Sequence, residues 1–122
     1  MTGFEQLDVW KAGCRLAVEI YGALQKCRDH GLRDQMQRAA VSIPSNIAES
    51  SERQSKREFV QFLYIAKGSC AELRTQLYIA AKVNVMSLET VNRLAEDAKH
   101  VSSMLHKLIK TRLSPTLNLE RH

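Results

Sequence analysis

The sequence predicts an all-α fold, an antiparallel up-down-up-down four-helix bundle. Apolar residues recur at three- and four-residue steps in four separate segments, which is the period of a helix with one buried face. Short polar connectors separate these segments, and helices joined by short loops pack antiparallel. A chain of 122 residues, 44% of them apolar, also suits one domain, residues 1–122, with a short C-terminal tail at 112–122.

The first helix is expected over residues 4–26. Thr2 and Glu5 have the spacing of a capping box, in which two side chains satisfy the free amides at the start of a helix. The apolar stripe that follows consists of Phe4, Leu7, Trp10, Cys14, Ala17, Ile20 or Tyr21, and Leu24. Residues 27–31 are expected to form the loop that leads to the second helix.

The second helix is expected over residues 32–50, with Pro44 in its interior. A proline there cannot donate to the carbonyl four residues earlier, which costs roughly 3 kcal/mol in an unsupported helix. The apolar spacing nevertheless continues on both sides of it. Because Ser42, Ser45 and Asn46 can bond the freed backbone, the sequence predicts a helix kinked at Pro44 and supported by these side chains.

The third and fourth helices are expected over residues 55–83 and 87–111. Ser55 and Glu58 form a second capping box, and Ser87 can cap the fourth helix. The fourth segment places its apolar residues in alternating three- and four-residue steps, as in a coiled-coil seam.

Polar residues near the packed faces, namely Ser42, Asn46, Glu49 and Ser69, can form either an active site or an internal hydrogen-bond network. The network is favoured, because the backbone around a proline inside a helix has groups to satisfy. Gly13, Gly22 and Gly68 each cost about 1 kcal/mol relative to alanine in a helix, so close helix approach is expected at them, and first of all at Gly68.

The charged residues of the third helix separate onto two flanks of its apolar stripe. One flank carries Lys56, Tyr64, Lys67, Arg74, Tyr78 and Lys82, and the other carries Glu58, Gln61, Glu72 and Gln76. The basic flank can contact phosphates and unstacked bases, meet the acidic flank of a neighbouring subunit, or be simply solvated. A net charge of +5 modestly favours an anionic partner. The candidate nucleic-acid contacts are Arg53, Lys56, Arg57, Lys67, Arg74 and Lys82.

No catalytic, metal or cofactor site is expected. A di-iron bundle needs Glu-x-x-His motifs, which are absent, and the three cysteines show no Cys-x-x-Cys spacing. The longest apolar runs are far below the ~20 residues that span a bilayer, and the N-terminus does not have the layout of a secretory signal, so a cytoplasmic protein without membrane contact is expected.

The stretch Ser42–Glu49 reads SIPSNIAE, lies between Arg38 and Arg53, and is followed by Gly68-Ser69. These residues resemble the small bacterial four-helix-bundle proteins encoded in intervening sequences of 23S rRNA genes, a family related to the accessory variability protein of diversity-generating retroelements. Ser50 departs from that family, which usually has glycine there. The motif residues that carry the resemblance are Arg38, Ser42, Pro44, Asn46, Glu49, Gly68 and Ser69.

The resemblance implies a cyclic homopentamer, with RNA and a reverse transcriptase as possible partners. Two functional hypotheses follow from the residues and the resemblance together. The first is a non-enzymatic, ring-forming bundle that binds RNA or other nucleic acid through basic surfaces. The alternative is a structural or protein-interaction homo-oligomer, for example a reverse-transcriptase accessory protein, that binds no nucleic acid of its own.

Overall fold

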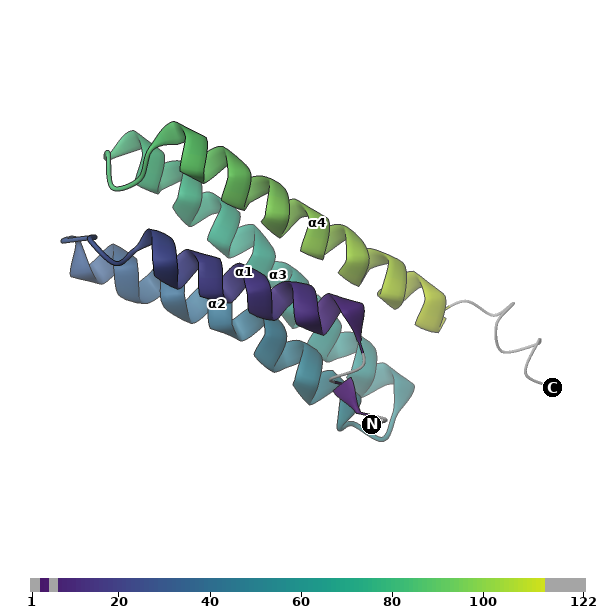
Figure 1. Ribbon diagram of the computed structural model, residues 1–122. Helices are drawn as coiled ribbons and strands as arrows, with labels where there is room; N and C mark the ends of the chain where they lie inside the picture. The colour runs from purple at the N-terminus through teal and green to yellow at the C-terminus, as the bar shows by residue number, and fades with distance from the viewer. Residues whose placement is uncertain (1–2, 5–6, 114–122) are drawn as a thin grey trace.

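Four α-helices make up the computed structural model, which describes residues 3–4 and 7–113. They are α1 (Asp8–Ala23), α2 (His30–Ser51), α3 (Lys56–Lys82) and α4 (Leu88–Leu113). The described residues contain no strand, so the predicted all-α four-helix bundle is confirmed. Along the chain the helices run back and forth across the bundle, and each packs against the one before it while α4 returns to α1 (Figure 1). None of the described helices is long and apolar enough to cross a membrane.

The first helix is shorter than the expected span of residues 4–26. The backbone at Leu7 is extended, so α1 begins only at Asp8, and the predicted capping box of Thr2 and Glu5 lies outside the described residues. At the other end, the amide of Leu24 bonds the carbonyls of both Ile20 and Tyr21. This tight turn ends α1 at Ala23, three residues before the expected end.

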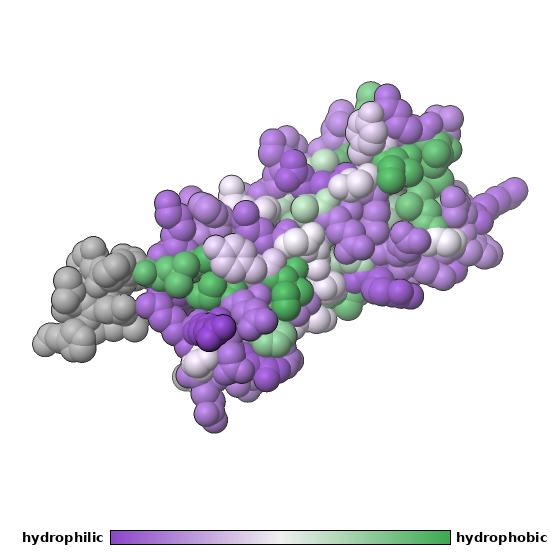
Figure 2. Space-filling view, turned by 180° about the vertical axis from the view of Figure 1, so that it is seen from behind, coloured by the Kyte–Doolittle hydropathy of each residue, from purple (hydrophilic) through white to green (hydrophobic). Residues whose placement is uncertain are grey.

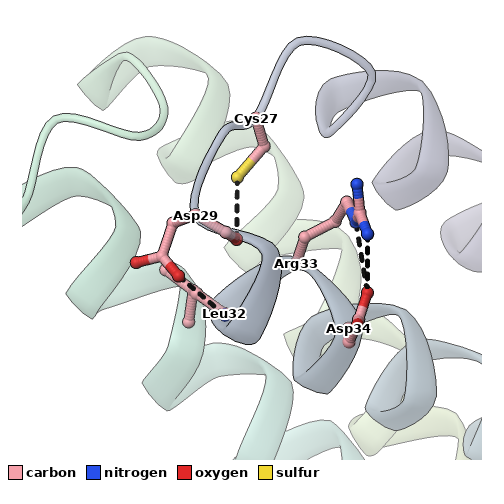
Figure 3. Close-up of polar contacts among 5 residues, drawn as sticks. All are labelled: Cys27, Asp29, Leu32, Arg33 and Asp34. Atoms are coloured by element: carbon pink, nitrogen blue, oxygen red, sulfur yellow. Dashed lines mark hydrogen bonds and ion pairs between the residues drawn. The ribbon is translucent and has the colours of Figure 1, made fainter.

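The second helix begins two residues before the expected residue 32, because Asp29 caps it. Asp29 Oδ1 accepts from the amide of Leu32 at 3.0 Å, and the thiol of Cys27 donates to the Asp29 carbonyl at 3.4 Å (Figure 3). Arg33 and Asp34 form an ion pair in the first turn. The two contacts of Asp29 therefore hold the turn that leads into α2.

The expected caps of α3 and α4 are confirmed. Ser55 Oγ accepts from the amide of Glu58 at 3.1 Å, which is one of the two bonds of the predicted capping box. The Ser55 hydroxyl also donates to the Glu58 carboxylate at 3.0 Å. Ser87 Oγ accepts from the amide of Thr90 at 3.1 Å at the start of α4. Between the two helices, Asn84 takes a positive φ of 63°, which lets the chain turn after α3.

Pro44 is buried within α2, which runs unbroken through it from His30 to Ser51. Gly13 of α1 faces Pro44: a Cβ there would lie 3.6 Å from two ring carbons of Pro44 and 3.3 Å from Ile43 Cγ2. The absent side chain of Gly13 thus makes room for the proline. That Pro44 kinks the helix stays a prediction.

The expectation of a close approach at Gly68 is wrong within this chain, and so is that at Gly22. No described atom lies within 4 Å of a Cβ built on either residue, because both lie on the exposed side of their helices. Close packing instead occurs at Gly13, which faces α2. The cost of Gly22 and Gly68 is therefore not offset by packing inside the chain.

Candidate nucleic-acid interface

Lys67 and Arg74 lie on the same side of α3, on either side of the buried Cys70. Burial raises the pKa of the Cys70 thiol to about 11, while the charges of Arg74 and Lys67 act in the opposite direction. Both cations are therefore close enough to Cys70 to influence its ionisation. Within residues 3–4 and 7–113, neither forms an ion pair with an acidic side chain.

Two tyrosines lie near these cations on the outer surface of α3. Tyr64 is 53% exposed and Tyr78 is 63% exposed, so both rings are accessible to a ligand. The Lys82 ammonium lies 5.5 Å from the centre of the Tyr78 ring. The basic flank, which consists of Lys56, Tyr64, Lys67, Arg74, Tyr78 and Lys82, thus combines positive charge with accessible aromatic rings.

Lys56 and Arg57 lie in the first turn of α3, and both are exposed. Positive charge at a helix N-terminus opposes the helix dipole, so these two residues do not stabilise α3 by their position. At the end of α4, by contrast, Arg112 complements the dipole and lies 4.4 Å over the ring of Phe59. This contact brings the end of α4 to the start of α3, so both groups of cations lie at one end of the bundle.

Arg53 is engaged within its own chain. Its guanidinium forms an ion pair with Glu49, one turn earlier, and lies 4.7 Å from the centre of the Phe62 ring. Its Nε is buried and has no hydrogen-bond partner among the described residues. Of the six candidate nucleic-acid contacts, Arg53 is thus the one that, within the described part of the chain, forms both an ion pair and a cation–π contact.

Three of the four polar residues considered for a network are joined between α2 and α3. Asn46 Nδ2 donates to the Ser42 carbonyl at 2.8 Å and to Ser42 Oγ at 2.9 Å. Ser42 Oγ lies 2.9 Å from Ser69 Oγ, which donates to the carbonyl of Ile65 at 3.2 Å. We call Ser42, Asn46 and Ser69 the polar seam. Glu49 is outside it, in its ion pair with Arg53.

A groove of about 430 Å³ opens beside the polar seam. Its lining residues are Gln35, Arg38, Ala39, Ser42 and Glu72. The motif residue Arg38 is exposed here. One turn beyond Glu72, the side chain of Gln76 is 6% exposed and its Oε1 has no partner among the described residues. Each residue of the polar seam therefore has a hydrogen-bond partner, whereas Gln76, which lies outside the seam, has a buried oxygen without one among the described residues.

Sequence reasoning missed a second groove, of about 530 Å³, between α1 and α2. Its lining includes Val18, Tyr21, Gln25 and Arg33. The available signal was Val18, an apolar residue that falls outside the stripe of the first helix and is 71% exposed.

Figure 2 shows the molecule from behind the view of Figure 1. On this side the described surface is mostly hydrophilic, and apolar surface appears in two separate areas toward the ends of the bundle.

The arrangement offers positive charge and aromatic surface. No group of three or more His, Cys, Asp or Glu side chains in the described part of the chain is arranged to hold a metal ion. Exposed cations and tyrosines are groups that bind phosphates and stack on bases.

No curated protein matches this chain. Its fold is similar to the crystal structure of a protein of unknown function from the S23 ribosomal protein family of Bacteroides thetaiotaomicron, with a TM-score of 0.80. The similarity covers 84% of this chain and 99% of the other at 23% sequence identity, which supports the shared fold alone. Residues 5–107 match the family of 23S rRNA-intervening sequence proteins. Because this match spans most of the chain, the protein belongs to the 23S rRNA-intervening sequence protein family.

Proposed function

We propose that this protein is a non-enzymatic, ring-forming helical bundle that acts in the cytoplasm and binds RNA through the basic flank of α3. The observation that carries the proposal is the pair Lys67 and Arg74, two cations on one side of a helix with no ion-pair partner among the described residues. Each such cation can neutralise one phosphate and release a counterion. The pair therefore provides the electrostatic part of nucleic-acid affinity.

The exposed rings of Tyr64 and Tyr78 supply the other part. Stacking of a base on an aromatic side chain is worth about 1–3 kcal/mol and accepts any base. Such stacking needs unpaired bases, so single-stranded or looped RNA is the preferred ligand over duplex. A ring would repeat the +5 charge of each subunit, which strengthens the potential that attracts RNA.

The second candidate function is protein interaction without nucleic-acid binding, through assembly with further copies or with a reverse transcriptase. It is favoured by Ile65 and Ile79, which are 45% and 43% exposed, and by the open surface over Gly68. Aliphatic side chains of this size gain free energy when an assembly removes them from water. In this case the basic flank would pair with acidic residues of a neighbouring subunit.

Fluorescence anisotropy of labelled single-stranded RNA, structured RNA and duplex DNA, measured across a salt series, separates the two functions. We expect the double variant Lys67→Glu, Arg74→Glu to lose RNA binding while light scattering shows an unchanged mass. Removal of two phosphate contacts should also reduce the slope of log affinity against log salt by about 1.4 for single strands. The matched control is Lys11→Glu, Lys107→Glu, which changes net charge equally at two other exposed positions.

A well-formed oligomer of the natural sequence that binds no RNA at physiological salt would overturn the proposal. If the Lys67→Glu, Arg74→Glu variant becomes monomeric while the control does not, the basic flank is a subunit interface and the second function holds. Equal weakening of both variants would show that net charge alone attracts RNA, without a defined surface on α3.

A further inference from the structure

The groove between α1 and α2 has the lining of a site for a planar polar ligand. Val18 and Tyr21 form the apolar part of the lining, and the Tyr21 ring provides a face on which a planar ligand can stack. Tyr21 is 45% exposed. Gln25 and Gln37 contribute two side-chain amides, each with donors and an acceptor. No acidic residue lines the groove. Its volume of about 530 Å³ is large enough for a small ligand.

Gly22 keeps this groove open. A glycine inside a helix costs about 1 kcal/mol relative to alanine, and here no described atom occupies the space that a Cβ would take. The chain's own packing therefore does not require a glycine at this position. Gly22 is itself part of the groove lining, so the absence of a side chain there leaves space within the groove.

Arg33 presents a fixed donor at the edge of the groove. Its Nε and Nη2 both donate to Asp34 Oδ1 at 3.1 Å, which holds the plane of the guanidinium and leaves Nη1 for another acceptor (Figure 3). In the adjoining loop, Lys26 and Arg28 are exposed cations. Oδ1 of the Asp29 carboxylate accepts from the amide of Leu32 and caps the helix, and no ion pair joins Asp29 to either cation within the described residues.

We propose that the groove between α1 and α2 binds one unstacked nucleobase of a single-stranded RNA. Tyr21 stacks on the base, the amides of Gln25 and Gln37 bond its edge, and Lys26 and Arg28 contact the phosphates on either side. This inference rests on the proposed RNA binding and adds a site on the opposite helix pair from the basic flank. An aromatic face, neutral amides and neighbouring cations together match a nucleotide better than an apolar peptide.

The test compares a uniform octanucleotide RNA with the same strand carrying one central abasic unit, by fluorescence anisotropy at fixed salt. We expect Tyr21→Ala to weaken binding of the intact strand about tenfold, from the loss of one base stack. Gly22→Leu, which fills the groove, should weaken it similarly, whereas Tyr21→Phe keeps the ring and should bind as the natural sequence does. Leu88→Ala is the control, because Leu88 is 66% exposed and lies outside both surfaces.

Thermal unfolding followed by circular dichroism and mass by light scattering accompany each variant. If the natural sequence binds RNA but Tyr21→Ala and Gly22→Leu leave the affinity unchanged, the groove proposal is overturned while the basic flank stands. If these variants alter the oligomer mass instead, the groove is a contact between subunits and the proposal is likewise wrong. Absence of RNA binding by the natural sequence would overturn the proposed function itself.

Discussion

Gly13 and Gly68 should respond in opposite directions to the same substitution. Replacing glycine by alanine inside a helix gains about 1 kcal/mol from intrinsic propensity. At Gly68 no described atom lies within 4 Å of the new Cβ, so the whole gain should appear as stability. At Gly13 the new Cβ would lie 3.3 Å from Ile43 Cγ2 and 3.6 Å from the ring of Pro44.

Ile43 has no exposed surface, so it has little room to move away from a new methyl group at Gly13. Overpacking of a core typically costs about 1–3 kcal/mol, which exceeds the gain in propensity. We therefore expect Gly13→Ala to destabilise the fold by about 1 kcal/mol and Gly68→Ala to stabilise it by a similar amount. The difference of about 2 kcal/mol corresponds to roughly 8 °C in melting temperature for a chain of this length.

Urea unfolding followed by circular dichroism measures both variants, at two protein concentrations and with the mass checked by light scattering. Equal stability of the two variants, or a more stable Gly13→Ala, would refute the argument that the contact with Pro44 selects glycine. A lower mass for Gly68→Ala would show that its open surface is covered by a second copy.

Two further outcomes are expected from urea unfolding. Pro44→Ala should keep α2 helical and raise the free energy of unfolding by about 1 kcal/mol. The alanine amide can donate to the carbonyl of Ala40, and this gain outweighs the packing against Gly13 that is lost with the ring. A lower urea midpoint would show that the proline is required for packing. Burial, and after it the nearby Glu19 carboxylate, raises the pKa of Asp97 above its ordinary 3.8, so its contribution to stability is complete below pH 3.8 and is lost as the pH rises through the raised value. Asp97→Asn should therefore flatten the pH dependence of the midpoint above pH 3.8 and raise stability at pH 7, and an unchanged pH profile would contradict this.

The helices could be predicted because their signals are local. The spacing of Ser55 and Glu58 is visible in four consecutive residues, and the structure joins these two residues by hydrogen bonds at the start of α3. The start of α2 was misplaced because Gly31 indicated a loop, although Asp29 is a favoured N-cap residue. A glycine in a first turn is compatible with a helix when a cap two residues earlier holds the backbone.

The surfaces were harder to predict, because they depend on which helix lies beside each side chain. Arg53 and Lys56 are three residues apart and carry the same charge, yet only Arg53 is engaged by Glu49 and Phe62. The separation of Lys67 and Arg74 from Glu72 follows from helix geometry alone and needed no tertiary information. Tertiary information was needed to see which glycine faces a neighbouring helix. The sequence favoured Gly68, whereas the structure places Gly13 against α2.

If subunits assemble through the side of α3 that carries Ile65 and Glu72, the proposed ring and the proposed RNA binding should respond differently to salt. On α3, Ser69 contacts α2, whereas Lys67 and Arg74 lie beside Cys70. Ile65 and Glu72 lie on another side of the helix from Lys67 and Arg74. Assembly through the side of Ile65 and Glu72 would therefore leave the basic flank open. Subunits of charge +5 repel one another, and salt screens this repulsion. Assembly through apolar contacts should then strengthen with salt while RNA binding weakens, because salt competes for the phosphates. If assembly instead weakens with salt in parallel with RNA binding, opposite charges hold the subunits together, and the basic flank is buried in the contact between subunits.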